Sequence, residues 1–467
     1  MSKNQNLTKD VDKVSLAAKA AFGGGIVCVA MGANGLQIIG KPVLNIIYGM
    51  DPAVIGLILA VMRIWDGLLD PIMGRVSDNS RLNYGRRKPY IIIGSVLTGL
   101  VFPLIWWMDP NWSDFQKSGY FFGACLLFYA CFTVVSVPYN TLSVELTPDY
   151  SERSRVRAAC SVANVFIFIV YGWTFSLTQM GWFESPEASM RVLAVVIALF
   201  MIIFGVFSGV VPQERYRKLA VKQEKVSIFK SFKEFLCDRN FLLMKGIGLG
   251  IVFGNNIVGF LAQYVEIFYV FEGNLVKGAM FSALNMTLLK LMELLTIFLL
   301  VRYFMNYDKR KVIMVLLGIT IVGVLAKWFL YNPNYPYLIF VSGFYMGPIT
   351  AGFWMLYSSL QSDYPDYDEY KNGLRREGTY SALGGWLVKV TVAIAMVCSG
   401  VILNITGFDQ ELRGDQPENT FLLMRILMIL LPFLFYSLSF YCLVKFALTK
   451  EKMQEIRDTL EERRNAV

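Results

Sequence analysis

Residues 63–89 read RIWDGLLDPIMGRVSDNSRLNYGRRKP and place charges inside an apolar helix. Arg63, Asp66 and Asp70 stand in a run long enough to cross a bilayer, where each central Asp or Arg costs about 2.5–3.5 kcal/mol to insert. At about 100° per residue, the three side chains fall within roughly 60° on one face of the helix. The stretch therefore predicts a membrane helix whose charged face is turned away from lipid.

Apolar runs of this length recur through the whole chain. Of its 467 residues, 55% are hydrophobic and 17% are charged, whereas soluble domains carry about 25% charged residues. Runs of about 20 apolar residues cross the roughly 30 Å of hydrocarbon in a bilayer as helices. We predict an all-α membrane protein with twelve such helices, near residues 17–40, 53–76, 90–108, 119–145, 158–180, 189–211, 241–271, 279–303, 311–331, 336–360, 377–405 and 420–448.

The twelve helices divide into two sets of six, separated by a basic linker. Acidic and basic residues follow both the second and the eighth helix, at Asp78 with residues 85–88 and at residues 308–311. Such a repeat is typical of membrane proteins built from two related halves. The predicted organisation is an N-terminal half at 1–211, a cytoplasmic linker at 212–240, a C-terminal half at 241–448 and a cytoplasmic tail at 449–467.

The net charge of +9 follows the predicted topology. Lys and Arg crowd into alternate loops, and the intervening loops, which include Lys41 and Lys117, hold few. This asymmetry places both termini and the linker in the cytoplasm. The basicity is therefore explained without a nucleic-acid partner.

Several kinds of catalytic and metal site are excluded by composition. The chain has no histidine, which rules out a histidine-based triad, a histidine zinc site and a histidine proton relay. Its seven cysteines are scattered and are interpreted as small apolar residues. We expect no cofactor, no enzymatic activity and no metal site beyond a cation at Asp66 and Asp70.

The charged face of the second helix favours cation binding. Two acids face one base, so a bound Na⁺ or a proton would neutralise the remaining negative charge, and the repulsion between Asp66 and Asp70 favours that binding. In a chain without histidine, a proton would have to sit on a carboxylate. The alternative is a buried ion-pair network, including Arg63, that only fixes helix packing.

Several motifs resemble a known family of carriers. The segment from Gly74 to Pro89 is similar to the loop signature of the major facilitator superfamily. Together with RIWDGLLDPIMG, VPYNTLSVELTPDYSERSRVR (137–157) and GFWMLYSSLQSDYPDYDEYKNGLRREGTYS (352–381), it resembles the glycoside–pentoside–hexuronide:cation symporters, which include melibiose permeases. The resemblance implies the major facilitator fold and cation-coupled sugar transport.

The resemblance also assigns roles to individual residues. Asp66 and Asp70 match the paired cation-site aspartates, and Thr133 matches a hydroxyl that helps to bind Na⁺. Lys389 matches a lysine near the cation and sugar sites, and Trp354 matches an aromatic residue near the sugar. Arg63 matches the arginine that precedes the aspartate pair.

The chain departs from melibiose permeases where those proteins grip the sugar. Ala30 and Ser136 stand at the positions of two sugar-binding acids, Asn140 replaces a tryptophan, and the helix-five arginine falls near Cys160 or Ser161. Leu69 replaces an asparagine, which removes one possible Na⁺ ligand and favours H⁺ as the coupling ion. The cation site is thus mostly kept, whereas the galactoside site is not.

Further residues are candidates for binding a sugar, because sugars stack on aromatic rings and hydrogen-bond to amides. They are Tyr139, Asn140, Asn164 and Tyr357, and for any one aromatic the alternative is a lipid-facing or interfacial position. Lys290 and Glu293 can form a local ion pair. Glu266 can hydrogen-bond a polyol, and the alternative is polar packing between helices. Lys327 receives no assignment.

Charged clusters near the cytoplasmic ends of helices four and ten form a predicted gate. The first contains Glu145, Asp149, Glu152 and Arg153, and the second contains Asp363, Asp366 and Arg375. We expect them to pair with the loops after the second and eighth helices and to hold the cytoplasmic side shut. In the first loop the partners are Gly74, Asp78, Arg86 and Arg87. Solvated loops are the alternative.

We therefore expect a monomeric carrier in the bilayer of the bacterial cytoplasmic membrane. It would import a sugar, glycoside or sugar acid with H⁺ or Na⁺ by alternating access. The alternatives are a carrier of amphiphilic or lipid-like cargo on the same scaffold and a non-transporting sugar sensor. A membrane enzyme is least favoured, because no nucleophile–base pair accompanies the acids.

Overall fold

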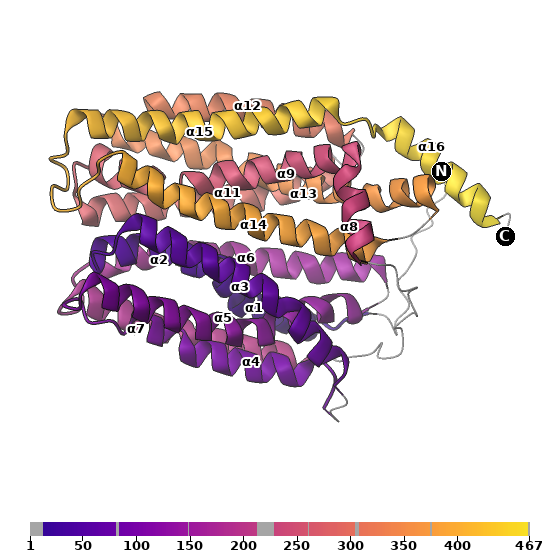
Figure 1. Ribbon diagram of the computed structural model, residues 1–467, viewed down its shortest axis with the longest axis horizontal. Coiled ribbons are helices and arrows are strands. Elements are labelled where there is room, and N and C mark those ends of the chain that lie inside the picture. Colours follow the sequence, from indigo (N-terminus) through magenta and orange to yellow (C-terminus); the bar gives the residue numbers. More distant parts are fainter. Residues whose placement is uncertain are drawn as a thin grey trace. The chain divides into compact units, whose positions relative to one another are not determined.

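The computed structural model describes residues 13–80, 84–147, 149–212, 228–259, 261–303, 308–373 and 376–465. These residues form helices and no strands, and twelve helical spans are long and apolar enough to cross a membrane. The predicted all-helical membrane fold is confirmed. The chain divides into two compact units, Met1–Lys222 and Gln223–Val467, and each contains six of the twelve spans. Figure 1 colours the first unit indigo to magenta and the second magenta to yellow.

Unit 1 begins with a long span, Leu16–Ile47, in which two π-helical turns interrupt the α-helix. Its segments are α1 (Leu16–Ala30), η2 (Met31–Gly35), α2 (Leu36–Pro42) and η3 (Val43–Ile47). The other elements are α3 (Pro52–Asp78), α4 (Lys88–Val101), η4 (Pro103–Trp106), α5 (Asp114–Glu145), α6 (Tyr150–Thr178) and α7 (Pro186–Val210). Helix α3 begins where the Asp51 side chain accepts a hydrogen bond from the Val54 amide, with Pro52 in the first turn, a common pattern at helix starts.

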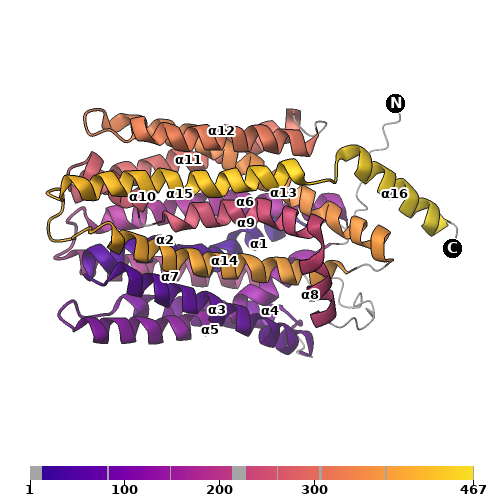
Figure 2. The same ribbon diagram turned by 45° about the horizontal axis from the view of Figure 1, so that its top comes forward.

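Unit 2 begins with the short helix α8 (Ile228–Cys237), which lies in the predicted linker. Its six spans consist of α9 (Arg239–Ile257) with α10 (Leu261–Tyr264) and η5 (Val265–Val270), α11 (Leu275–Tyr303), α12 (Lys309–Leu330), η6 (Pro336–Leu338) with α13 (Ile339–Asn372), α14 (Glu377–Ile405) and α15 (Glu418–Lys445). A terminal helix, α16 (Lys450–Asn465), contacts α13 and projects from the end of this unit (Figure 2).

The first span is longer than the hydropathy pattern predicts. Lys41 is assigned to a loop by its charge, but it lies inside the helix and is 7% exposed. The helix continues through Pro42, which has no backbone N–H to donate. It ends with the π-helical turn η3, in which the hydrogen bonds span five residues. The charge of Lys41 therefore marks a buried position and not the end of the helix.

Equivalent ends of the two units are held by the same kind of contact. In unit 1, Lys88 at the start of α4 donates from Nζ to the carbonyl of Val210 at the end of α7 (2.9 Å). In unit 2, Arg310 at the start of α12 donates from Nη2 to the carbonyl of Val444 near the end of α15 (2.7 Å). Each base satisfies a carbonyl that the helix end leaves without an intrahelical partner.

The opposite ends of the same helices repeat a second contact. Arg191 of α7 donates from Nη2 to the carbonyl of Met108, just beyond η4 (2.7 Å). Arg425 of α15 donates from Nη2 to the carbonyl of Trp328, near the end of α12 (2.8 Å). The two repeated contacts support an internal duplication, because they join corresponding helices of the two units.

Candidate functional site

Two of the three charges on the charged face of α3 are buried. Asp66 is 3% exposed and Arg63 is 8% exposed, and the Arg63 Nη1 atom lies 4.0 Å from Asp66 Oδ2. Between residues 57 and 72, the large exposed side chains of the helix are apolar: Leu57, Val61, Ile64, Leu68 and Ile72. The helix thus turns its apolar side outward and its charges toward protein, as the insertion cost predicts.

Helix α5 packs against α3 and supplies further oxygen atoms near these charges. The fully buried Tyr129 lies close enough to Arg63 and Asp66 to interact with both charges. One helical turn later, Thr133 is buried and its hydroxyl donates to the Tyr129 carbonyl (2.9 Å). The structure therefore places the predicted Thr133 in the turn of α5 that adjoins the Arg63–Asp66 pair.

Asp70 follows Asp66 by one turn and is half-buried. The carboxylates, together with the hydroxyl of Thr133, are hard oxygen ligands of the kind that suits a proton or an alkali cation. No group of three or more His, Cys, Asp and Glu side chains in the described ranges has the arrangement of a metal site. Tyr129 was not predicted, although its position four residues before Thr133 places it on the same face of the helix.

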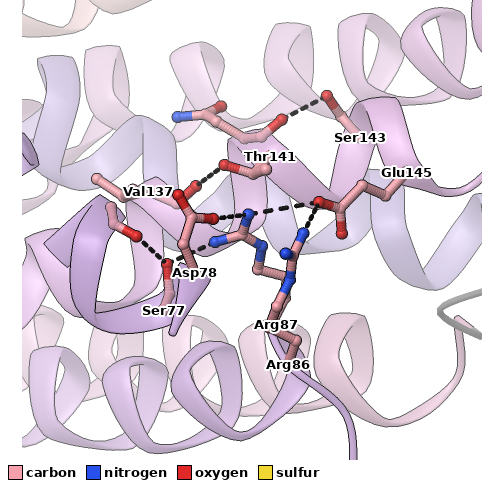
Figure 3. A network of polar contacts seen from close by, with 10 residues as sticks. Ser77, Asp78, Arg86, Arg87, Val137, Thr141, Ser143 and Glu145 are labelled. Atoms are coloured by element: carbon pink, nitrogen blue, oxygen red, sulfur yellow. Dashed lines mark hydrogen bonds and ion pairs between the residues drawn. The ribbon is translucent and has the colours of Figure 1, made fainter. Parts of the chain in front are cut away.

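A second polar cluster joins the ends of α3 and α5 through the loop that precedes α4 (Figure 3). Arg87 is 3% exposed, donates from Nη1 to Ser77 Oγ (2.6 Å) and pairs with Asp78. Its Nη2 also lies 3.4 Å from Glu145 Oε1, and Arg86 Nη2 lies 2.5 Å from the same oxygen. The predicted pairing of Glu145 with both loop arginines is present.

Gly74 and Arg153 have local contacts. The Gly74 carbonyl accepts a hydrogen bond from the Ser77 hydroxyl (3.1 Å), so it supports the residue that binds Arg87. Arg153 does not act in this cluster as expected: its Nε donates to the Thr147 carbonyl (2.8 Å), six residues back. Arg153 thus closes the turn between α5 and α6.

Glu152 forms a separate ion-pair cluster at the start of α6. Its buried carboxylate lies 2.7 Å from Lys19 Nζ, pairs with Arg155 and accepts a hydrogen bond from the Val14 amide (3.3 Å). Burial raises the pKa of Glu152, but the three hydrogen bonds outweigh burial and the pKa lies below its ordinary value. The sequence placed Glu152 in the predicted gate, whereas the structure uses it to hold the start of α1.

Acidic residues of unit 2 also form ion pairs near the ends of its helices. Asp363 of α13 lies 3.1 Å from Lys309 Nζ at the start of α12 and 2.7 Å from Arg457 Nη2 of α16. Arg375 lies outside the described residues. Its neighbour Arg376 is buried and pairs with Asp368 (2.7 Å) and Glu234, and the hydrogen bond with Asp368 raises the pKa of the guanidinium.

Tyr139 and Tyr357 use their hydroxyls in contacts between helices. The Tyr139 hydroxyl donates to the carbonyl of Phe22 in α1 (2.7 Å), and the two rings stack at 4.4 Å. The Tyr357 hydroxyl donates to the carbonyl of Met244 in α9 (3.0 Å). Both tyrosines are buried, and each joins corresponding helices of its unit. These contacts give both tyrosines a packing role, and their contact with a sugar stays a prediction.

The remaining substrate candidates are divided between the units. Asn140 is exposed and Asn164 is half-buried in unit 1. In unit 2, Trp354 is exposed and its ring meets Phe353 nearly edge-on at 5.3 Å, and Lys389 is half-buried on α14. These four side chains remain predictions for sugar binding.

Four other intramembrane charges of unit 2 interact with nearby groups. Lys290 Nζ lies 2.6 Å from Glu293 Oε2, as the spacing along the helix predicts. Glu266 is buried, accepts a hydrogen bond from the Tyr331 hydroxyl (3.0 Å) and interacts at longer range with Lys327. The contacts of Glu266 with Tyr331 and Lys327 link η5 with the end of α12.

We predict that Tyr139→Phe and Tyr357→Phe each lower the free energy of unfolding by about 1 kcal/mol, because each loses one buried hydrogen bond. The KM for the transported substrate should stay unchanged. Thermal unfolding of the purified variants and initial uptake rates measure the two effects. Tyr441→Phe, at an exposed ring, is the control. A several-fold rise in KM without a loss of stability would support the substrate-binding interpretation.

Comparison with known proteins agrees with this architecture. The sequence profile of the MFS/sugar transport protein family matches residues 21–450. An uncharacterized symporter of Synechocystis sp. is 23% identical and aligns with 97% of this chain and 98% of its own length. The glucuronide carrier protein homolog of Escherichia coli is 22% identical over 87% of each chain.

The fold also matches solved structures. A crystal structure of a D-xylose–proton symporter superposes with a TM-score of 0.64, covers 92% of this chain and 97% of its own, and is 12% identical. At that identity the likeness supports the fold alone. Because the family profile covers more than nine-tenths of the sequence, the chain belongs to the MFS/sugar transport protein family.

Proposed function

We propose that the protein is a secondary symporter that imports a sugar, glycoside or sugar acid together with H⁺ or Na⁺. The observation that carries this proposal is the burial of Asp66 beside Arg63, against the turn of α5 that holds Thr133. Retaining such charges inside a membrane span is costly, and intramembrane carboxylates commonly serve ion pathways. The relatives described as symporters and carriers support the same assignment.

Cation binding would complete the charge balance on α3. When Arg63, Asp66 and Asp70 are all ionised, the three groups carry one net negative charge. A proton or Na⁺ at the aspartates brings that charge to zero. Neutralisation lowers the free-energy cost of the conformational change that exposes the site to the other side of the membrane. Coupling is thermodynamic: cation and substrate each raise the affinity for the other by the same factor.

Alternating access also requires an end of the carrier that opens and closes. In unit 1 the cluster of Asp78, Arg86, Arg87 and Glu145 joins the ends of α3 and α5. We assign this end to the cytoplasm, because Lys and Arg are concentrated in the loops on that side. The ion pairs would form and break as the carrier changes state.

Uptake into membrane vesicles tests the proposal. A panel of neutral glycosides, pentosides and uronates is offered while a Na⁺ gradient or a pH gradient is imposed separately. We expect a pH gradient of one unit to support up to about tenfold accumulation of one substrate class at one H⁺ per substrate. Vesicles without the protein, and vesicles treated with an ionophore, are the controls. Uptake that only equilibrates under both gradients would contradict the symport mechanism.

A further inference from the structure

Lys245 of α9 is a buried ammonium with no assigned role in the proposed mechanism. The side chain is 5% exposed, and its Nζ lies 4.2 Å from the ring centre of Tyr380 and 5.6 Å from that of Phe241. A Cβ atom at Gly384 of α14 would lie 2.6 Å from Nζ, so the glycine leaves the space that the ammonium occupies. Lys245 therefore fills a tight position between two membrane spans.

This ammonium has no acidic counter-ion among the described residues of unit 2. Across residues 228–259, 261–303, 308–373 and 376–465, no carboxylate oxygen lies within 4.0 Å of its Nζ. Three acids of α8 and α13, and of the turn before α9, pair with other bases. Glu234 of α8 and Asp368 of α13 bind Arg376, and Asp238 pairs with a lysine of α13. The two aromatic rings are the contacts that stabilise the charge.

Unit 1 shows that helix packing does not require this lysine. Gly23 follows Phe22, whose carbonyl accepts the Tyr139 hydroxyl, and a Cβ atom there would lie 3.1 Å from the backbone of Ala159 in α6. Lys245 follows Met244, whose carbonyl accepts the Tyr357 hydroxyl. Small residues thus form the crossing of α1 with α6, whereas a charge stands at the corresponding crossing of α9 with α14.

A buried ammonium without an anion is costly, and cation–π contacts offset only part of that cost. We propose that Lys245 binds an oxyanion on the substrate, such as a carboxylate, so that the transported sugar is acidic. This inference rests on the proposed function and narrows its substrate class. An ammonium donates three hydrogen bonds to oxyanions, and the aromatic walls at Tyr380 and Phe241 strengthen the attraction by excluding water.

Binding to the purified full-length protein in nanodiscs tests the proposal with matched probes. The pairs are methyl β-D-glucuronide with methyl β-D-glucoside, and methyl β-D-galacturonide with methyl β-D-galactoside, which differ only at the carboxylate. We expect the wild-type protein to bind at least one acidic member at least tenfold more tightly than its neutral partner. Lys245→Met should weaken binding of that acidic member about tenfold or more and leave the neutral one unchanged, since a lost charge-assisted bond has this size.

Two further variants separate charge from packing. Lys245→Arg should retain the preference for the acidic probe, and Lys277→Met, at an exposed lysine, should bind as the wild type does. Equal affinity of the wild type for both members of every pair would overturn the inference. The inference would also be overturned if Lys245→Met lost affinity equally for the acidic and the neutral probe, as a structural role predicts. Failure of both acidic probes to bind the wild type would overturn it as well.

A labelling measurement on the wild-type protein covers the case in which Lys245→Met fails to fold. The acidic probe that binds should slow acylation of Lys245, measured by mass spectrometry, while its neutral partner leaves the rate unchanged. Equal rates with the two probes would also overturn the inference. If a neutral glycoside accumulates under a cation gradient while the acidic probes do not bind, the symporter proposal stands and the role of Lys245 fails. If neither gradient drives accumulation of any sugar, the symporter proposal fails instead.

Discussion

Replacing Asp70 with asparagine should abolish cation-driven accumulation of the substrate while leaving substrate exchange across the membrane. Asparagine keeps the size of aspartate, but it releases no proton and carries no negative charge to balance a bound Na⁺. Under a pH gradient of one unit, accumulation should fall from up to about tenfold to equilibration. Vesicle uptake with and without the gradient, together with counterflow of labelled substrate, measures both properties.

Asp66→Asn should lose coupling in the same way and should also destabilise the protein. Asp66 lies 4.0 Å from the buried Arg63, so neutralising it removes a counter-ion from an interior guanidinium. Breaking a buried pair from one side costs about 3–5 kcal/mol. The double variant Arg63→Gln with Asp66→Asn removes both charges, so it should recover much of the stability but none of the coupling.

Asp114→Asn is the matched control, because Asp114 is an exposed carboxylate in the first turn of α5. It should accumulate substrate as the wild type does. Normal accumulation in Asp70→Asn, at equal expression, would show that the acidic face of α3 does not hold the coupling ion. Loss of counterflow together with accumulation would indicate a general defect in transport.

The number and order of the membrane spans follow directly from the sequence, because crossing a bilayer imposes a length and a hydropathy that few other elements share. Charge within such a span is equally informative, since an ionised group in lipid is costly wherever it stands. Burial of the α3 charges and pairing of Glu145 with Arg86 were therefore predictable. Both depend on a large local cost and not on details of packing.

Features that depend on which helix faces which were not predictable in the same way. Hydropathy does not distinguish a tyrosine that binds a sugar from one that donates to a neighbouring backbone, so the hydrogen bonds of Tyr139 and Tyr357 between helices were not predicted. Lys41 resembled the end of a helix because π-helical turns leave no clear mark in the sequence. Lys245 received no role in the sequence interpretation because a single charge barely changes the hydropathy of a long apolar run.

The cation site was predictable only in part. Asp66 and Asp70 were predictable from their cost on one helix, whereas Thr133 was assigned through resemblance to a family. Tyr129 became apparent only when α5 was placed against α3. A site shared by two helices is specified by their relative rotation, which depends on many weak contacts that a single sequence does not reveal.

Arg87→Ala should lower the thermal stability of the protein and should reduce uptake at least tenfold. The guanidinium is 3% exposed and binds Ser77 and Asp78 at the end of α3 as well as Glu145 at the end of α5. Alanine leaves these groups without the base that joins them. Since Asp78 is largely exposed and water can replace part of the pairing, we expect a loss on the order of 2–3 kcal/mol.

The expected loss of uptake has a different origin from the loss of stability. If the cluster closes one end of the carrier, its removal favours the state in which that end is open, and the cycle slows because the closed state is less populated. Arg87→Lys keeps the charge but not the several donors of the guanidinium, so it should recover only part of both properties. Unfolding curves and initial uptake rates of the purified, reconstituted variants measure them separately.

Arg75→Ala is the matched control, because Arg75 is an exposed arginine one turn before the Asp78 end of α3. It should change stability by no more than about 0.5 kcal/mol and leave uptake unchanged. If Arg87→Ala behaves like Arg75→Ala, the loop cluster neither stabilises unit 1 nor takes part in gating. If Arg87→Ala loses stability but transports at the wild-type rate, the cluster is structural, and closure of that end must depend on other contacts.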